Sequence, residues 1–256
     1  MKEPGCVLIT GATGEIGGAL ALAYARPGCT LILQGRRVER LHGLAQACQA
    51  RGAQVQVQAL DVRDRGALRS WLQGVCASVV PDLVIANAGV NTDIGPDGAG
   101  ERWEDTQALV EINLLAGMAT VDAVLPALRQ RGCGQVALVS SLAGYFGLPV
   151  TPSYSASKAG LKAYGEALRG WLAPEGISVN VVMPGYVQSP MCDAMPGPKP
   201  FLWTPERAAQ VIRQGLARNK ARISFPFPLN FGCWWLAVLP AGVSQRIVRW
   251  LGYGAK

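Results

Sequence analysis

A tyrosine and a lysine stand four residues apart in this chain, within the run SYSASK at residues 153–158. Residues at this spacing share one face of a helix, so the phenol of Tyr154 and the ammonium group of Lys158 should lie one turn apart. A tyrosine hydroxyl has a reference pKa of about 10, and a nearby cation lowers that pKa by favouring the phenolate. The pair is therefore predicted to exchange a proton with an alcohol or a ketone. Any helix can carry this spacing by chance, so the rest of the chain must show whether the pair is catalytic.

Composition narrows the class of protein. The chain has 256 residues, 50% of them apolar, which suits one α/β sheet of six or seven strands with a large core. Its single histidine, His42, lies in a run typical of a solvated helix, which argues against Ser-His-Asp hydrolysis and histidine-rich metal sites. The seven cysteines form no Cys-x-x-Cys pair, so reduced thiols are expected rather than a disulfide frame or a zinc site. No metal is expected.

The net charge and the N-terminal residues indicate which partners and which cellular compartment to expect. The formal net charge is +7, but lysines and arginines are spread in ones and twos, so no nucleic-acid partner is expected. An anionic cofactor, and secondarily a membrane surface, explains the charge better. The N-terminus runs almost directly into an apolar strand and leaves no room for a secretory signal, which predicts a cytoplasmic protein.

The first motif is a glycine-rich loop between a strand and a helix. Residues 6–10 are an apolar run typical of a parallel strand covered on both faces, and an apolar helix is predicted over 19–25. In this context glycines let the backbone approach a pyrophosphate, and the helix N-terminus offers it free N–H groups. The alternative is a purely structural tight turn. The predicted cofactor contacts are Gly11, Thr13, Gly14, Glu15 and Ile16.

The second predicted strand, 30–34, indicates which cofactor is bound. It ends in Gly35, Arg36 and Arg37, where a dinucleotide fold meets the adenosine ribose. An acidic residue there favours a free 2′-hydroxyl and an arginine favours a 2′-phosphate, so NADP (NADPH) is predicted over NAD. The alternative is that the two arginines only open a charged helix over 38–50.

Three later strands end in small or polar residues. Runs at 54–60, 82–86 and 135–140 have the patterns of strands, the first with its small apolar residues on one face. The ligand crevice of an open parallel sheet lies beyond the carboxyl ends of its strands, so the residues that follow these runs should share one edge. They are Asp61, Val62, Asn87, Ala88, Gly89 and Ser141, beside Gly11.

Two of the polar residues have alternative predicted roles. Asp61 either accepts a hydrogen bond from an adenine amino group or caps a helix that begins at Arg63, and the two roles are compatible. Asn113 lies among apolar neighbours in a long helical region. A buried amide must be hydrogen-bonded, so Asn113 either bridges backbone groups or fixes a water near a site.

The last third of the chain is predicted to shape the substrate side. A sixth strand over 177–183 precedes a proline-rich loop near 190–204, and a seventh is predicted over 221–225. We expect one catalytic domain over 1–256, with this loop as a substrate lid and 226–256 as an apolar C-terminal extension. The extension is too short and interrupted to span a bilayer. Three roles are open for the extension: a cover over the substrate pocket, an oligomer contact, or a weak anchor at a membrane surface through Arg246 and Arg249. The cover is favoured, and it would use Trp234, Trp235, Leu236, Val238 and Leu239.

Together these motifs resemble the short-chain dehydrogenase/reductase family, in its short form, over nearly the whole chain. The resemblance implies a Rossmann-like α/β fold: a doubly wound parallel sheet of about seven strands with helices on both faces. Two positions depart from the common short form: Glu15 stands where that form has its middle glycine, and Ala86 where an asparagine is frequent. The motifs are the glycine loop, Asp61-Val62, Asn87-Ala88-Gly89, Asn113, Ser141, Tyr154 with Lys158, and Pro184-Gly185.

The resemblance also implies an activity. NADPH would deliver hydride to a carbonyl carbon while Tyr154 gives a proton to the oxygen and Ser141 holds that oxygen. Lys158 would lower the pKa of Tyr154 and bind the nicotinamide ribose, and Asn113 would hold a water linking Lys158 to solvent. A homodimer or homotetramer is implied. Further cofactor contacts fall on Pro184, Gly185, Val187 and Ser189.

Two other functions stay open on the sequence. The spacing Gly11, Gly14, Gly17 is similar to that of nucleotide-sugar epimerases and dehydratases, although no large C-terminal substrate domain follows. A non-catalytic, membrane-associated NADP-binding protein is the other, and the intact catalytic set argues against it. We favour an oxidoreductase acting on a small carbonyl or secondary alcohol. Phe201, Trp203, Trp234 and Trp235 favour apolar ketones as its substrates.

Overall fold

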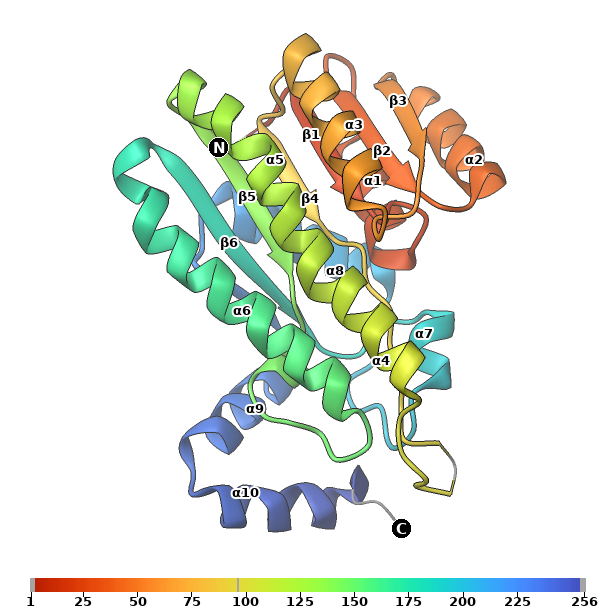
Figure 1. Ribbon diagram of the computed structural model, residues 1–256, viewed down its shortest axis with the longest axis vertical. Coiled ribbons are helices and arrows are strands. Elements are labelled where there is room, and N and C mark those ends of the chain that lie inside the picture. Colours follow the sequence, from red (N-terminus) through yellow and green to blue (C-terminus); the bar gives the residue numbers. More distant parts are fainter. Residues whose placement is uncertain (1–2, 96, 254–256) are drawn as a thin grey trace.

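Over residues 3–95 and 97–253, which the computed structural model describes, the chain forms a seven-stranded sheet in the order β3-β2-β1-β4-β5-β6-β7 (Figure 1). Every pairing is parallel. The strand order runs outward in one direction from β1 and in the other from β4, which makes the sheet doubly wound. The predicted fold is therefore confirmed. The strands are β1 Cys6–Thr10, β2 Thr30–Gly35, β3 Gln54–Ala59, β4 Leu83–Ala86, β5 Gly134–Val139, β6 Ile177–Pro184 and β7 Arg222–Phe225.

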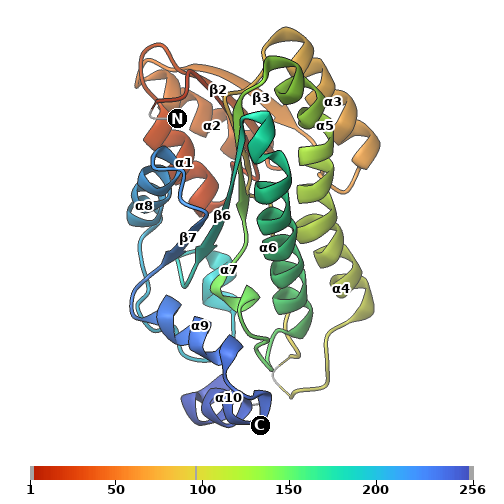
Figure 2. The ribbon, with the colours of Figure 1, turned by 90° about the vertical axis from the view of Figure 1, so that its left-hand side faces the viewer.

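Helices cover both faces of the sheet because the side chains of each central strand alternate between two apolar cores. Val7 and Ile9 of β1 pack in the core formed with α1, α2 and α8. Leu8, between them, packs in the other core, with α3, α5 and α6. Figure 2 shows α5 and α6 side by side on this second face. The helices are α1 Glu15–Tyr24, α2 Val38–Gln49, α3 Arg65–Ser78, α5 Ala116–Arg131, α6 Pro152–Leu172 and α8 Pro205–Ala217.

The edge strand β3 is the least covered. Its apolar residues were predicted to share one face, and in the structure Val57 of that face is exposed and Val55 is only partly buried. β3 pairs with β2 alone among the described strands, so no second neighbour supplies a helix to close over it.

One long apolar helical run crosses the second face. α4 (Trp103–Val110) continues through a π-helical turn, η1 (Glu111–Leu115), into α5. The run Trp103–Arg131 is long and apolar enough to cross a membrane by composition. More than half of its most apolar window is buried inside the protein, against α3 and α6, as in a core helix.

The last elements lie beyond the carboxyl ends of the strands (Figures 1 and 2). The proline-rich loop begins as a short helix, α7 (Pro190–Ala194), and does not stay irregular as predicted. After β7, helices α9 (Leu229–Val238) and α10 (Ala241–Val248) and a π-helical turn, η4 (Arg249–Tyr253), follow. These segments close one side of the site.

Candidate active site

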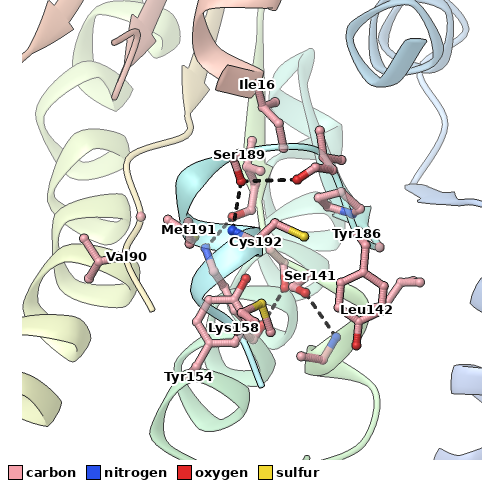
Figure 3. Close-up of a pocket in the computed structure, with 18 of the residues that line it drawn as sticks. Ile16, Val90, Ser141, Leu142, Tyr154, Lys158, Tyr186, Ser189, Met191 and Cys192 are labelled. Carbon is pink, nitrogen blue, oxygen red and sulfur yellow. Dashed lines mark hydrogen bonds between the residues drawn. The ribbon is translucent and has the colours of Figure 1, made fainter. Parts of the chain in front are cut away.

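A cleft of about 940 Å³ opens at the carboxyl ends of the strands. Every residue predicted to be catalytic or to bind the cofactor, except Asn113, lies on its wall. One half is lined by the glycine loop and the ends of β2, β3 and β4, and the other by α7, α9, α10 and η4. Tyr154, Lys158 and Ser141 lie between the halves (Figure 3).

The glycine loop owes its shape to contacts that a side chain would block. Gly11 has φ +65°, and a Cβ on it would lie 2.6 Å from the Cα of Ala88. A Cβ on Gly17 would lie 2.4 Å from the carbonyl oxygen of Gly11. Asn87 fixes the loop from the side by donating from Nδ2 to the carbonyl oxygens of Thr10 and Gly11, at 3.2 and 3.0 Å. These contacts hold the loop against the end of β4.

The helix after the loop starts earlier than predicted. α1 begins at Glu15, directly after Gly14, and the predicted start at residue 19 is therefore wrong. Gly14 has no side chain to cap the helix, so the first-turn N–H groups face the cleft without a side-chain acceptor. Glu15 therefore lies in the first turn of α1. The glycines that would let a ligand approach the backbone of the loop closely are Gly11 and Gly14.

Three arginines surround the end of β2. Arg37 donates to the carbonyl oxygen of Thr13 at 2.6 Å, which ties it to the glycine loop. Arg36 lies 3.9 Å from a carboxylate oxygen of Asp61, and Arg40 lies 3.8 Å from one of Glu15. Gly35 has no room for a side chain, because a Cβ would meet the side chain of Thr13 at 2.6 Å. This corner of the cleft is therefore predominantly cationic.

Asp61 does not cap the helix that follows it. Its carboxylate accepts from the backbone N–H and the guanidinium of Arg63, which lowers its pKa, with further lowering from Arg36. The helix α3 begins at Arg65, and the side chain of Asp64 caps it by accepting from the N–H of Ala67 at 2.9 Å. The capping alternative for Asp61 is wrong, because a second aspartate three residues later is nearer the helix end.

The three catalytic candidates meet at the start of α6. Lys158 is fully buried, and its Nζ donates to the carbonyl oxygen of Val139 at 3.0 Å. Ser141 opens the 3-10 turn Leu142–Gly144, where its Oγ accepts from the N–H of Ala143 (Figure 3). Ser140 fixes the strand end to the helix by donating to the carbonyl oxygen of Lys158 at 2.7 Å. The end of β5 and the first turns of α6 thus position one another.

The pKa values of the tyrosine and the lysine differ from the prediction. The Nζ of Lys158 lies 5.7 Å from the ring centroid of Tyr154 and faces the end of β5. Burial raises the pKa of Tyr154, and the neighbouring Ser141 hydroxyl opposes part of this rise. Burial lowers the pKa of Lys158 to about 8. In the protein alone, the predicted fall in the pKa of Tyr154 is therefore wrong, because desolvation outweighs the cation.

Asn113 lies behind the cleft wall, in the π-helical turn η1. Its Oδ1 accepts from the N–H of Val90 at 2.8 Å, and its Nδ2 donates to the carbonyl oxygen of Val90 and to Ser157. It therefore bridges backbone groups, one of its two predicted roles. A Cβ on Gly89 would lie 3.3 Å from both Asn113 Oδ1 and Lys158 Nζ, so this glycine leaves the space between them open. Its predicted hold on a water stays a prediction.

The segment after β6 crosses the cleft above these residues. Ser189 caps α7 by accepting from the N–H of Cys192 at 3.0 Å, and it donates to the carbonyl oxygen of Val187 (Figure 3). A Cβ on Gly185 would lie 2.9 Å from Pro226, so this glycine lets the segment after β7 pack beneath it. Pro184, Gly185, Val187 and Ser189 all line the cleft as predicted.

The C-terminal extension contributes to the wall with only one of its faces. Trp235, Leu236 and Leu239 line the cleft, as predicted for a cover. The prediction is wrong for Trp234 and Val238, which are exposed and lie outside the wall. α9 has two faces, and the two tryptophans are adjacent in sequence and so point in different directions.

A pair of tyrosines that the sequence did not single out fastens this cover. Tyr186 donates from its hydroxyl to that of Tyr253 at 2.9 Å, and Tyr253 donates to the carbonyl oxygen of Pro198 at 2.6 Å. The chain of bonds joins the segment after β6, the turn η4 and the proline-rich loop. Nothing in local spacing could have shown it, since Tyr186 and Tyr253 are 67 positions apart.

Comparison with known proteins gives concordant matches. The family described as short chain dehydrogenase matches residues 5–197. An uncharacterized oxidoreductase of Myxococcus xanthus is 37% identical over 244 residues, which cover 94% of this chain and 95% of that protein. The 3-oxoacyl-[acyl-carrier-protein] reductase FabG of Thermotoga maritima is 31% identical over 216 residues, covering 80% and 87%.

Solved structures match over nearly the whole chain. A short-chain dehydrogenase from Sphingobium yanoikuyae in complex with NADPH superposes with a TM-score of 0.80 at 25% identity, covering 95% of both chains. A short-chain dehydrogenase from Streptomyces avermitilis gives a TM-score of 0.77 at 25% identity, covering 96% of both chains.

Proposed function

Because the chain belongs to the short-chain dehydrogenase family of oxidoreductases, we propose that it is an NADPH-dependent reductase of apolar ketones, with Tyr154 as general acid and base. The observation that carries this proposal is the position of Ser141, Tyr154 and Lys158 between two unlike halves of one cleft. One half has glycines and arginines, and the other is almost wholly apolar.

The first half fits a dinucleotide phosphate. Gly11 and Gly17 let the loop pack closely against the end of β4 and the start of α1, and the uncapped helix end suits a pyrophosphate. Arg36 is the best-placed group for a 2′-phosphate, because Arg37 is already bonded to the glycine loop. NADPH held there would supply a hydride to a carbonyl carbon lying beside Tyr154.

The chain's own residues would handle the proton. The raised pKa of Tyr154 keeps its hydroxyl protonated at neutral pH, which suits a group that must donate to a carbonyl oxygen gaining negative charge. Ser141 would donate to the same oxygen and hold it at the tyrosine. Lys158, with a pKa of about 8, is mostly cationic at neutral pH and would stabilise the phenolate that remains.

The second half supports an uncharged, apolar substrate. No charged side chain lies on this half among the described residues, and its polar hydroxyls, those of Tyr186 and Tyr253, bond to each other. An ionic or sugar group placed there would lose water without gaining partners, which weighs against a nucleotide-sugar substrate. The wall consists mainly of Leu142, Phe146, Leu148, Met191, Met195, Leu229, Leu236, Leu239, Ile247 and Val248.

The remaining parts of the proposal concern organisation. All seven cysteines, which lie within the described residues, are free thiols, and this supports a cytoplasmic, reducing environment. We propose a single catalytic domain over 1–256, in which α7 and the loop near 190–204 form the substrate lid and 226–256 the cover. Membership of the family supports a homodimer or homotetramer.

A substrate screen tests the proposal. The purified protein is mixed with NADPH and a panel of ketones in matched sets: aryl and long-chain alkyl ketones, keto acids of equal size, and ketoses. Loss of NADPH absorbance should be fastest with the neutral apolar set. No NADPH consumption with any set, or a preference for keto acids or ketoses, would refute the apolar substrate class.

A further inference from the structure

Helix α9 is apolar on the face that turns away from the cleft as well as on the face that lines it. Leu229, Cys233 and Leu236 point to the cleft. Phe231, Trp234 and Val238 are exposed, and none of them lies on the cleft wall. If α9 only covered the cleft and faced water on its other side, this outer face would carry polar residues.

The aromatic side chains of α9 form one cluster. The rings of Trp234 and Trp235 have centroids 5.3 Å apart, and that of Phe231 lies 6.0 Å from each of them. Phe227, just before α9, is also exposed, and Trp250 of η4 is 84% exposed. We call Phe231, Trp234 and Val238, together with Phe227, the outward face of α9; Trp235 lies at its border with the cleft. Exposed apolar clusters of this kind mark sites of contact with another surface.

The charged residues that flank this face in the sequence are all cations. Residues 223–245 contain no charged side chain, and after Glu206 every charged residue is a lysine or an arginine. Arg222 precedes the uncharged stretch and is paired with Glu166. Arg246 and Arg249 follow the stretch, and both are exposed. An uncharged aromatic face followed by the exposed cations Arg246 and Arg249 is complementary to a surface of apolar chains beneath anionic groups.

The geometry suits contact with such a surface, not passage through it. α9 has 10 residues and is therefore about 15 Å long, half the thickness of a bilayer core. Trp235 and Leu251 line the cleft and are also 44% and 46% exposed, so they form part of its rim. The cleft thus opens beside the outward face of α9.

We propose that the outward face of α9, with Trp250, Arg246 and Arg249, docks on the surface of an anionic phospholipid membrane. The docked cleft would then receive an apolar ketone directly from the lipid, a consequence that rests on the proposed function. The docking itself does not depend on catalysis. A second copy of the chain on the same face is the competing occupant, and the experiment separates the two.

The test is co-sedimentation of the whole protein with vesicles of phosphatidylcholine alone and of phosphatidylcholine mixed with phosphatidylserine. Wild type should bind the anionic vesicles, and salt should weaken this binding. Phe231→Ser with Trp234→Ser should reduce partitioning at least about tenfold. Trp103→Ser, which changes a 70% exposed tryptophan on α4, is the matched control and should bind as wild type does. Arg246→Gln with Arg249→Gln should cost about fivefold per arginine and remove most of the salt dependence.

Three results would overturn the proposal. They are no binding of wild type to anionic vesicles, an equal loss in Trp103→Ser, and a lipid-free dimer that Phe231→Ser with Trp234→Ser dissociates in sedimentation velocity. Tyr154→Phe should still bind vesicles, because docking does not depend on catalysis. A wild type that binds vesicles but reduces no ketone would contradict the proposed function alone. Phe231 and Trp234 do not line the cleft, so their variant should keep its rate with a water-soluble ketone.

Discussion

Replacing Arg36 with glutamine should weaken NADPH binding by about ten- to hundredfold and change NADH binding by less than about twofold. The Arg36 side chain is 57% exposed, and its nearest carboxylate oxygen, on Asp61, is 3.9 Å away. Exposed ion pairs at such a distance contribute about 0–1 kcal/mol. Little stability is therefore lost when the guanidinium leaves Asp61 to bind a phosphate. A charge-assisted hydrogen bond to the phosphate contributes about 1.5–3 kcal/mol, which gives the predicted range.

Fluorescence titration of both cofactors at low and at moderate salt measures the effect. The margin between NADPH and NADH in wild type should shrink as salt rises, because the phosphate contact is partly exposed. Arg69→Gln is the matched control, since Arg69 is an exposed arginine paired with Asp122 and does not line the cleft. Equal affinities of wild type for NADPH and NADH at low salt would refute the assignment of NADP.

Three further predictions concern the cover, the buried lysine and the packing of α6. Tyr253→Phe removes the hydroxyl that joins Tyr186 to Pro198, so the Michaelis constant for a bulky apolar ketone should rise about fivefold while the dissociation constant of NADPH stays the same; an unchanged Michaelis constant would contradict this role. The pKa of Lys158 falls from 10.5 to about 8 on folding, so burying its charge costs stability below pH 8 and this cost disappears between pH 8 and 10.5. Wild type should therefore gain stability as the pH rises, and Lys158→Met should not. In urea unfolding, the free energy of unfolding of Lys158→Met minus that of wild type should fall by on the order of 3 kcal/mol from pH 7 to 10.5, and a constant difference would contradict the pKa shift of Lys158. A Cβ on Gly165 would lie 2.6 Å from Val181, whereas one on Gly170 of the same helix meets nothing within 4 Å. Gly165→Ala should lower the free energy of unfolding by about 1–2 kcal/mol and Gly170→Ala should raise it by about 0.5–1 kcal/mol; equal effects in thermal unfolding would contradict the close packing.

The parts of the site that the sequence predicted depend on local rules. An apolar strand followed by glycines and a helix is recognisable along a short window, and so is the four-residue spacing of Tyr154 and Lys158. Parallel strands bring their carboxyl ends to one edge, so residues such as Asn87 and Ser141, far apart in sequence, could be placed together.

The parts that sequence did not predict depend on tertiary contacts. Whether burial or the nearby cation has the larger effect on the pKa of Tyr154 depends on how deeply the ring is buried, and the spacing of residues does not show this depth. The choice of Asp64 over Asp61 as a cap depends on where α3 begins. The bond between Tyr186 and Tyr253 joins distant segments, and the division of α9 into two apolar faces could not be seen because both faces have the same composition.

Single-turnover reduction of an apolar ketone by the NADPH complex of Tyr154→Phe, beside wild type, tests the central claim most directly. The substitution keeps the ring and removes the hydroxyl proton, so the rate should fall at least about hundredfold while the dissociation constant of NADPH stays within about twofold. A variant that reduced the ketone at nearly the wild-type rate would show that Tyr154 is not the proton donor.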